Sequence, residues 1–281
     1  MNQERVRCLF TTFLLIAGLL MSVREARADL TITPVRVVFQ DRDRSATIEL
    51  INVTNRTNTY RMSWLLMKAD NRGRYTLVPA TNDQDPSSVA NMVIFTPRQV
   101  TIEPHGYQII RLSARRPAGL PFGEYRAHLA MTRLANQGPP KPDISPKKGK
   151  ELALNVNLSF SIPVIVRSGE DNDLKVALDS PQLAMGGGKG APTVVLNIDL
   201  NRVAGKFSSY GIINVFWQPP DGQEKQIGAM GNVALYPELK QRHISIPLTE
   251  NPTGGKIRVA YMGKYESEGR TWDEKIFPIG K

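Results

Sequence analysis

Few residues in this sequence have the types and spacing that catalysis or metal binding requires. The stretch MGGGKG at residues 185–190 has the glycines of a phosphate-binding loop, but no Ser or Thr follows Lys189 and no helical pattern begins there. A turn between two strands is the favoured interpretation of this stretch. His105, His128 and His243 are far apart in the sequence, and none has a second ligand residue at a spacing typical of metal sites.

Nucleophilic and carboxylate chemistry also lacks candidates. The sequence has no Gly-x-Ser-x-Gly elbow, and its single cysteine, Cys8, lies in an N-terminal apolar segment. The acidic residues are too scattered to nominate a pair of catalytic carboxylates. We therefore expect a protein that is not an enzyme, with no catalytic residue, no metal and no cofactor. His128 lies on an alternating strand, so we expect it to be exposed or half-buried.

The N-terminal segment is organised like a secretory signal peptide. Arg5 and Arg7 precede an apolar run from Cys8 to Met21, and the segment closes with the cleavage pattern Ala26-Arg27-Ala28. A membrane anchor is the alternative, but the run is shorter than the ~20 residues that a spanning helix needs. We expect residues 1–28 to be removed on export. The remaining chain would contain no cysteine and would be held together by its core.

The formal net charge of +10 raises the question of an acidic partner. The basic residues are scattered along the expected strands and form no block. A solvated basic surface is therefore the favoured interpretation, attraction to an acidic partner is the second, and nucleic acid is not expected to be a partner of an exported chain.

The elements that would position any site are strands. Short alternating runs recur between turn residues, and no long stretch has helical periodicity. Residues 29–167 contain about seven strands by this criterion, which is the count of an immunoglobulin-like sandwich. Trp64 is expected in the core, and Pro34 suggests an edge or a kink. The alternating segments that make up the six or so strands before the last one cover 30–40, 45–53, 59–67, 74–78 (the shortest), 92–102, 107–116 and 123–134.

A polar stretch, SGEDND at 168–173, is expected to be a hinge. Further alternating segments follow it and predict a second all-β unit of about a hundred residues. The predicted organisation is thus a signal peptide at 1–28, an N-terminal immunoglobulin-like domain at 29–168 and a C-terminal β-sandwich domain at 169–281. The fold class is all-β.

The last strand of the first domain is the unusual one. In ELALNVNLSFSIPVIVR, residues 151–167, every even position from 152 to 166 is apolar. Such a strand would span roughly 45 Å if straight, whereas a domain of this size has a diameter of only ~35–40 Å. Residues 135–150, before it, are rich in Pro, Gly and Lys and predict a mobile loop. We expect Phe160 to Val166 in the core and residues 152–158 exposed, where they could add a strand to another protein.

Four stretches resemble the periplasmic pilus-assembly chaperones of the P-pilus type: PVRVVF, FTPRQVTIEPHGYQIIRLSAR, LPFGEYRAHLAM and LSFSIPVIVRSG. The resemblance covers the first domain almost entirely and the second in architecture. It implies two immunoglobulin-like sandwiches in an L-shaped or boomerang arrangement. In this family the seventh strand fills the open groove of a pilus subunit that lacks its own last strand. The inserting residues here would be Leu152, Leu154, Val156 and Leu158.

The resemblance also implies a basic anchor for the carboxylate at the C-terminus of the subunit. Arg36, within RVVF, matches the arginine of that anchor, but Pro163 stands where the family has a lysine. Either another base such as Arg126 takes the lysine's part, or the chain belongs to a divergent branch. The family also pairs a glutamate with a seventh-strand arginine to fix the angle between domains, and Glu124 and Arg167 match this pair. An ordinary surface ion pair is the alternative.

The expected function is that of a chaperone for pilus, fimbrial or related surface subunits. Whether an outer-membrane usher takes part, and whether the free chain caps its own edges as a dimer, stay open. An immunoglobulin-like surface or adhesion module is the second hypothesis, and an exported enzyme, for which no residue can be nominated, is the third.

Overall fold

The computed structural model describes residues 29–40, 42–78, 89–134, 158–186 and 193–279. In these ranges the protein is all-β, as expected, and its strands are joined by turns and by two short 3-10 helices, η1 (Val89–Asn91) and η2 (Tyr265–Ser267). The expected signal peptide, the loop at 135–150 and most of the glycine-rich stretch at 185–190 lie outside the described residues.

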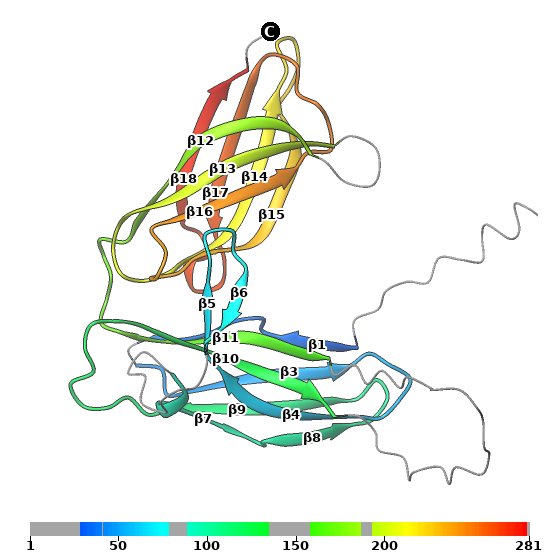
Figure 1. Ribbon diagram of the computed structural model, residues 1–281, viewed down its shortest axis with the longest axis vertical. Helices are drawn as coiled ribbons and strands as arrows, with labels where there is room; N and C mark the ends of the chain where they lie inside the picture. Colours follow the sequence, from blue (N-terminus) through cyan, green and yellow to red (C-terminus); the bar gives the residue numbers. More distant parts are fainter. Residues whose placement is uncertain (1–28, 41, 79–88, 135–157, 187–192, 280–281) are drawn as a thin grey trace, which may run out of the picture.

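Two sheets face each other in the N-terminal part of the chain, which we call the first sandwich (Figure 1). The four-stranded sheet has the order β1 (Leu30–Thr33), β3 (Ser45–Asn52), β9 (Tyr107–Ala114) and β7 (Val93–Thr96). The five-stranded sheet has the order β2 (Val37–Phe39), β11 (Ser159–Ser168), β10 (Gly123–Arg133), β4 (Asn58–Leu65) and β8 (Gln99–Ile102). The order in the first sheet, and β4-β10-β11 in the second, are those of an immunoglobulin constant-type domain.

Two segments that the alternation predicts as single strands cross from one sheet to the other. The segment 30–40 divides into β1 and β2 around Pro34, and 92–102 divides into β7 and β8 around Pro97. Proline has no N–H for the ladder, so a strand ends or bends there. The break at Pro34 was expected from the sequence, whereas the one at Pro97 was not.

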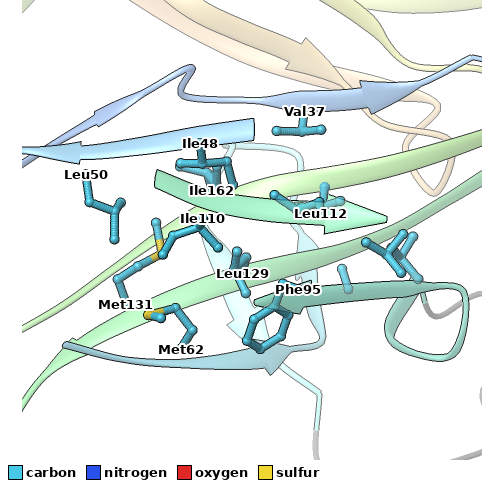
Figure 2. Packing of buried hydrophobic residues seen from close by; sticks show 14 of the residues in the cluster. Val37, Ile48, Leu50, Met62, Phe95, Ile110, Leu112, Leu129, Met131 and Ile162 are labelled. Atoms are coloured by element: carbon cyan, nitrogen blue, oxygen red, sulfur yellow. The ribbon is translucent and has the colours of Figure 1, made fainter. Parts of the chain in front are cut away.

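The core of the first sandwich is formed by inward side chains of both sheets (Figure 2). Full burial of one such side chain stabilises the fold by about 1.5–3 kcal/mol. Trp64 lies at the margin of this core, half-buried, with its ring edge-on to Phe95 at 5.4 Å between centroids. The labelled core residues are Val37, Ile48, Leu50, Met62, Phe95, Ile110, Leu112, Leu129, Met131 and Ile162.

The stretch after β4 leaves the first sandwich as a hairpin of β5 (Met67–Ala69) and β6 (Tyr75–Leu77). The sequence predicts 59–67 and 74–78 as strands of the sandwich, and this is wrong for 67 and for 75–77. Figure 1 shows that the hairpin rises from the first sandwich towards the second. It is held there because the backbone N–H of His243 donates to the carbonyl of Asn71 at 2.6 Å and the N–H of Ala69 donates to Glu238 at 3.2 Å.

The C-terminal part of the chain forms the second sandwich, from a three-stranded and a four-stranded sheet. Its core is a separate cluster that includes Trp217, Tyr261 and Trp272. In Figure 1 the strands of the two sandwiches run in crossing directions, so the molecule is L-shaped. The three-stranded sheet has the order β12 (Lys175–Gly186), β13 (Thr193–Ala204) and β16 (Gln241–Pro247); the four-stranded sheet has β15 (Lys225–Leu235), β14 (Ser209–Gln218), β17 (Lys256–Gly263) and β18 (Thr271–Pro278).

Candidate functional site

Strand β11 lies at the centre of the candidate site. It pairs with β10 along its whole length, from Ser159 opposite Thr132 to Ser168 opposite Gly123. Its other edge pairs with β2 only over 164–166. Among the described residues, the edge at 159–163 therefore has no strand beside it. Along the inward face, Ile162, Val164 and Val166 are buried and Phe160 is half-buried against the core.

The residues expected to insert into a subunit are mostly beyond the described ranges. Leu152, Leu154 and Val156 lie outside them. Leu158 is the first described residue of this stretch, and its side chain is 41% exposed. Its carbonyl accepts a hydrogen bond from the N–H of Arg133 at 2.9 Å. The main chain at Leu158 thus already follows β10, while its side chain is at the surface.

Arg36 lies between the two sandwiches, on the segment that joins β1 to β2. It is 3% exposed. Its Nε donates to Oε1 of Glu266 at 3.0 Å, its Nη2 donates to Oγ of Ser208 at 3.0 Å, and its guanidinium lies 4.6 Å from the ring centroid of Tyr210. Burial, the largest single influence, disfavours the charged guanidinium, but Glu266, Tyr236 and Glu124 together outweigh it and raise the pKa of Arg36. The expected anchor is thus paired with a carboxylate of the chain itself.

Glu124 and Arg167 are in contact, and the pair is buried. Nε of Arg167 donates to Oε2 of Glu124 at 3.0 Å, and the side chains are 7% and 0% exposed. The N–H and the hydroxyl of Ser208 donate to the same oxygen, at 3.0 and 2.9 Å. Burial alone would raise the pKa of Glu124, but the charges of Arg167 and Arg36 and the Ser208 hydrogen bonds lower it.

Glu266 joins the two arginines into one network. Its Oε1 lies 2.8 Å from Nη2 of Arg36 and 3.5 Å from Nη2 of Arg167. Glu266 is carried by η2, and Ser208 lies just before β14, so the second sandwich supplies both residues. Neither residue could be nominated from the sequence, because both lie in short connections, KYESEG and GKFSSY, that have no pattern of their own.

Pro163 on β11 and Arg126 on β10 lie on the same face of the five-stranded sheet, on neighbouring strands. Pro163 is opposite His128 in the ladder, and Arg126 is opposite Ile165. The guanidinium of Arg126 forms an ion pair with Glu238 and lies over the ring of Tyr236, 3.5 Å from its centroid. Like Arg36, Arg126 is therefore engaged by the second sandwich.

His128 is buried, at 2% exposure, and the expectation of an exposed or half-buried side chain is wrong. The reason is the β5–β6 hairpin, which covers the outer face of the five-stranded sheet. The ring of Tyr75, on β6, stands edge-on to the imidazole at 5.0 Å between centroids. Burial, with a smaller contribution from the charge of Arg126, lowers the pKa of His128 to about 4. The imidazole is thus neutral at neutral pH.

A cavity of about 520 Å³ opens beside Pro163, between the two sandwiches. The first sandwich, the hairpin and the second sandwich all contribute to its wall. Its lining includes Val35, Tyr75, His128, Pro163, Tyr210 and Tyr236.

Metal-ligand clusters and membrane-spanning helices are both absent from the described residues. No group of three or more His, Cys, Asp or Glu residues there is placed to hold a metal ion. His105 is bonded to Asn55 at 2.8 Å, and His243 to Asp199 at 2.5 Å. No described helix is long and apolar enough to cross a membrane.

The sequence matches no family model and no curated protein. Several solved structures are similar at low identity. The YadV chaperone is 13% identical, with 90% of this chain and 100% of that chain covered and a TM-score of 0.44. The CupB2 chaperone of Pseudomonas aeruginosa is 14% identical, with 89% and 100% covered and a TM-score of 0.45. The structure of the Salmonella enterica SafA pilin in complex with the SafB chaperone is 12% identical, with 90% of this chain and 97% of that chain covered and a TM-score of 0.44. Similarity at this level concerns the fold alone.

Proposed function

We propose that this protein is a periplasmic chaperone that binds pilus, fimbrial or related surface subunits by donating a strand to them. The observation that carries the proposal is the position of β11. Its edge at 159–163 has no neighbour among the described residues, and the alternating apolar sequence continues for eight positions before it, from 151 to 158. An unpaired edge with alternate apolar side chains is the geometry required for strand addition.

The energies fit a complex that forms and later exchanges. Burial of Leu152, Leu154, Val156 and Leu158 in a subunit would contribute about 1.5–3 kcal/mol each, so roughly 6–12 kcal/mol in total. Association costs about 4–15 kcal/mol. The side chains alone barely hold the subunit, so backbone pairing along β11 and a charge-assisted contact to Arg36 have to supply the remainder.

Arg36 would receive the C-terminal carboxylate of the subunit in exchange for Glu266. The two carboxylates are chemically alike, so the exchange preserves the charge balance around a buried guanidinium. The Glu124–Arg167 pair and Ser208 would keep the two sandwiches at a fixed angle during the exchange. In this proposal no catalytic step and no cofactor takes part.

The test is the double variant Leu154→Asp with Val156→Asp, co-expressed with a pilus subunit that lacks its own last strand. Two carboxylates in an apolar groove should abolish co-purification of the subunit. The matched control is Ala153→Asp with Asn155→Asp, which adds the same charge on the opposite face of the alternation and should leave co-purification intact. Retention of the subunit by the Leu154 and Val156 variant would rule out strand donation.

An immunoglobulin-like surface or adhesion module is the second candidate, supported by the same sandwich topology. Cell fractionation separates the two: a chaperone should be recovered in the soluble periplasmic fraction, and a surface module should stay with the cells.

A further inference from the structure

The cavity between the sandwiches has a lining that is specific in its chemistry. Its wall contains Leu30, Ile32, Val35 and Phe160 as apolar groups and three tyrosines, Tyr75, Tyr210 and Tyr236. Among the residues that the structure describes, no Asp, Glu, Lys or Arg is part of the lining. Its volume of about 520 Å³ falls in the range of small-molecule sites. The guanidiniums of Arg36 and Arg126 lie behind Tyr210 and Tyr236. Both are already paired, with Glu266 and Glu238, so an uncharged and largely apolar ligand is favoured.

One buried polar side chain in this wall has no hydrogen-bond partner among the described residues. Both ring nitrogens of His128 are buried and unpartnered. The tyrosines differ, since the hydroxyls of Tyr75 and Tyr236 are bonded to each other at 3.0 Å and that of Tyr210 donates to Asn232 at 2.6 Å. A neutral imidazole offers one donor and one acceptor. Its natural complement is a single hydroxyl, which can donate and accept.

The cavity is placed where a bound strand would pass. Ser161, Ile162 and Pro163 all line it, and all lie on the part of β11 whose edge is unpaired among the described residues. A strand added to this edge would therefore carry its side chains along the mouth of the cavity.

We propose that this cavity is a binding site for a hydroxyphenyl group, contributed by a tyrosine side chain of the subunit that pairs with β11. The ring would pack among the aromatic and aliphatic groups of the wall, and its hydroxyl would bond to His128. The identity of the protein that supplies the tyrosine rests on the proposed function, whereas the chemistry of the cavity does not.

The probe for the cavity is p-cresol, which is the tyrosine side chain without a backbone. Titration of the purified protein, followed by the NMR signals of the His128 ring, should show saturable millimolar binding. Toluene, which lacks the hydroxyl, and 4-methylbenzoate, which is charged, should each bind about tenfold more weakly or worse. Equal or tighter binding of 4-methylbenzoate, or no binding of p-cresol, would overturn the proposal.

Two variants assign the binding to this cavity. His128→Phe keeps a ring but removes both nitrogens, so p-cresol should bind it no better than toluene, by calorimetry. Ser161→Trp, at an exposed position of the lining, should block p-cresol and toluene alike. The matched control is His105→Phe, in an exposed turn bonded to Asn55, and it should bind as the parent does. Unchanged p-cresol binding in both cavity variants would contradict the assignment.

The subunit provides the second half of the test. In the parent protein the subunit should co-purify, and His128→Phe should weaken its affinity about tenfold without abolishing it. Binding of p-cresol without any binding of the subunit would retain the cavity and overturn the proposed function. Subunit binding that is insensitive to both cavity variants would retain the function and overturn the role of the cavity in it.

Discussion

At the scale of single residues, the region between the sandwiches is a set of buried charges that compensate one another. Arg36, Arg167, Glu124 and Glu266 all lie there with little exposure. A buried ion pair does not by itself stabilise a fold against an apolar alternative, but the loss of one partner is costly because the other charge stays buried. The network therefore fixes the relative position of the two sandwiches, because its bonds form only when Ser208 and η2 lie against β11 in one arrangement.

The first prediction concerns Glu266→Gln. The change leaves Arg36 and Arg167 with one carboxylate fewer, so the free energy of unfolding should fall by about 3–5 kcal/mol, as when a buried pair is broken. If Arg36 receives the carboxylate of the subunit, the same change removes the internal competitor, so affinity for the subunit should rise. Chemical denaturation and a binding titration measure the two effects.

The opposite signs of these effects separate the anchor from a purely structural pair. Glu268→Gln, at an exposed neighbour of Glu266, is the control and should change neither quantity. A loss of affinity in Glu266→Gln that parallels the loss of stability would show that Arg36 serves only the contact between the sandwiches.

The second prediction concerns acid stability and His128. The unfolded imidazole takes up its proton near pH 6.5, whereas in the folded state burial and the charge of Arg126 lower the pKa to about 4. Between these values the unfolded chain binds more protons, so stability is retained above pH 6.5 and lost as the pH falls towards 4. At ~1.4 kcal/mol per pKa unit the loss is about 3 kcal/mol. His128→Phe should remove it.

The measurement is the free energy of unfolding of both proteins at several pH values from 7.5 to 4.5. The difference between the two curves isolates His128 from the carboxylates, which titrate in both. Parallel curves for the parent and His128→Phe would contradict a buried neutral imidazole.

At the scale of elements, alternation predicted the strands well, but it did not predict which sheet each strand joins. Side-chain period two is a local property, so the runs at 45–53 and 107–116 appear as β3 and β9 within one or two residues of the expected bounds. A change of sheet is decided by packing of the whole sandwich, so the division of 92–102 at Pro97 was missed. The position of the β5–β6 hairpin depends on its contacts with the second sandwich, and the sequence of residues 67–77 alone does not predict those contacts.

The candidate site shows the same division. Arg36, Glu124 and Arg167 could be nominated because they lie in stretches that resemble a known family, although Pro163 departs from it. The partners of these residues could not be nominated, since Ser208 and Glu266 come from turns of the second sandwich. His128 was misplaced because alternation gives the face of a strand and not what covers that face.

The third prediction tests the hairpin as a contact between the sandwiches. Gly73, at its tip, has φ +77°, and a Cβ there would lie 2.3 Å from Nη2 of Arg242. That guanidinium donates through Nη1 to the carbonyl of Ala234 at 2.7 Å, so moving it breaks a hydrogen bond. Gly73→Ala should therefore lower the free energy of unfolding by about 1–3 kcal/mol. Hydrogen exchange at the N–H of His243, bonded to Asn71 in the hairpin, should become faster.

Gly119→Ala separates the two causes. Gly119 has nearly the same backbone angle, φ +70°, but a Cβ there would meet nothing within 4 Å. Its substitution carries the cost of the left-handed conformation alone, and exchange at His243 should not change. If Gly73→Ala costs no more than Gly119→Ala, the hairpin tip is not tightly held against Arg242.

At the scale of the whole molecule, the two sandwiches have separate cores and a mixed contact. The contact combines a small apolar cluster, Ala69, Ile165, Tyr210, Ala234 and Tyr236, with the charges around Glu124. Interfaces of this kind inside one chain are normally mobile. Here the buried network and the hairpin act at two places along the contact, and the cavity with its unpartnered His128 lies in the same cleft. A fixed angle between the sandwiches is therefore a precondition for both the proposed anchor and the proposed hydroxyphenyl site.

The fourth prediction is that Glu124→Ala uncouples the sandwiches. The change leaves the buried guanidinium of Arg167 without its nearest carboxylate and removes both hydrogen bonds that Ser208 donates, so it should cost about 3–5 kcal/mol. Because the loss falls on the contact, the two cores should then unfold separately. Trp64 reports on the first sandwich, and Trp217 and Trp272 report on the second. Fluorine-labelled tryptophan should show one coincident transition in the parent and two in the variant.

Glu224→Ala is the control, since it removes an exposed ion pair with Arg258 inside the second sandwich and should leave the transitions coincident. A single lowered transition in Glu124→Ala would mean that the hairpin and the apolar cluster suffice to couple the two cores.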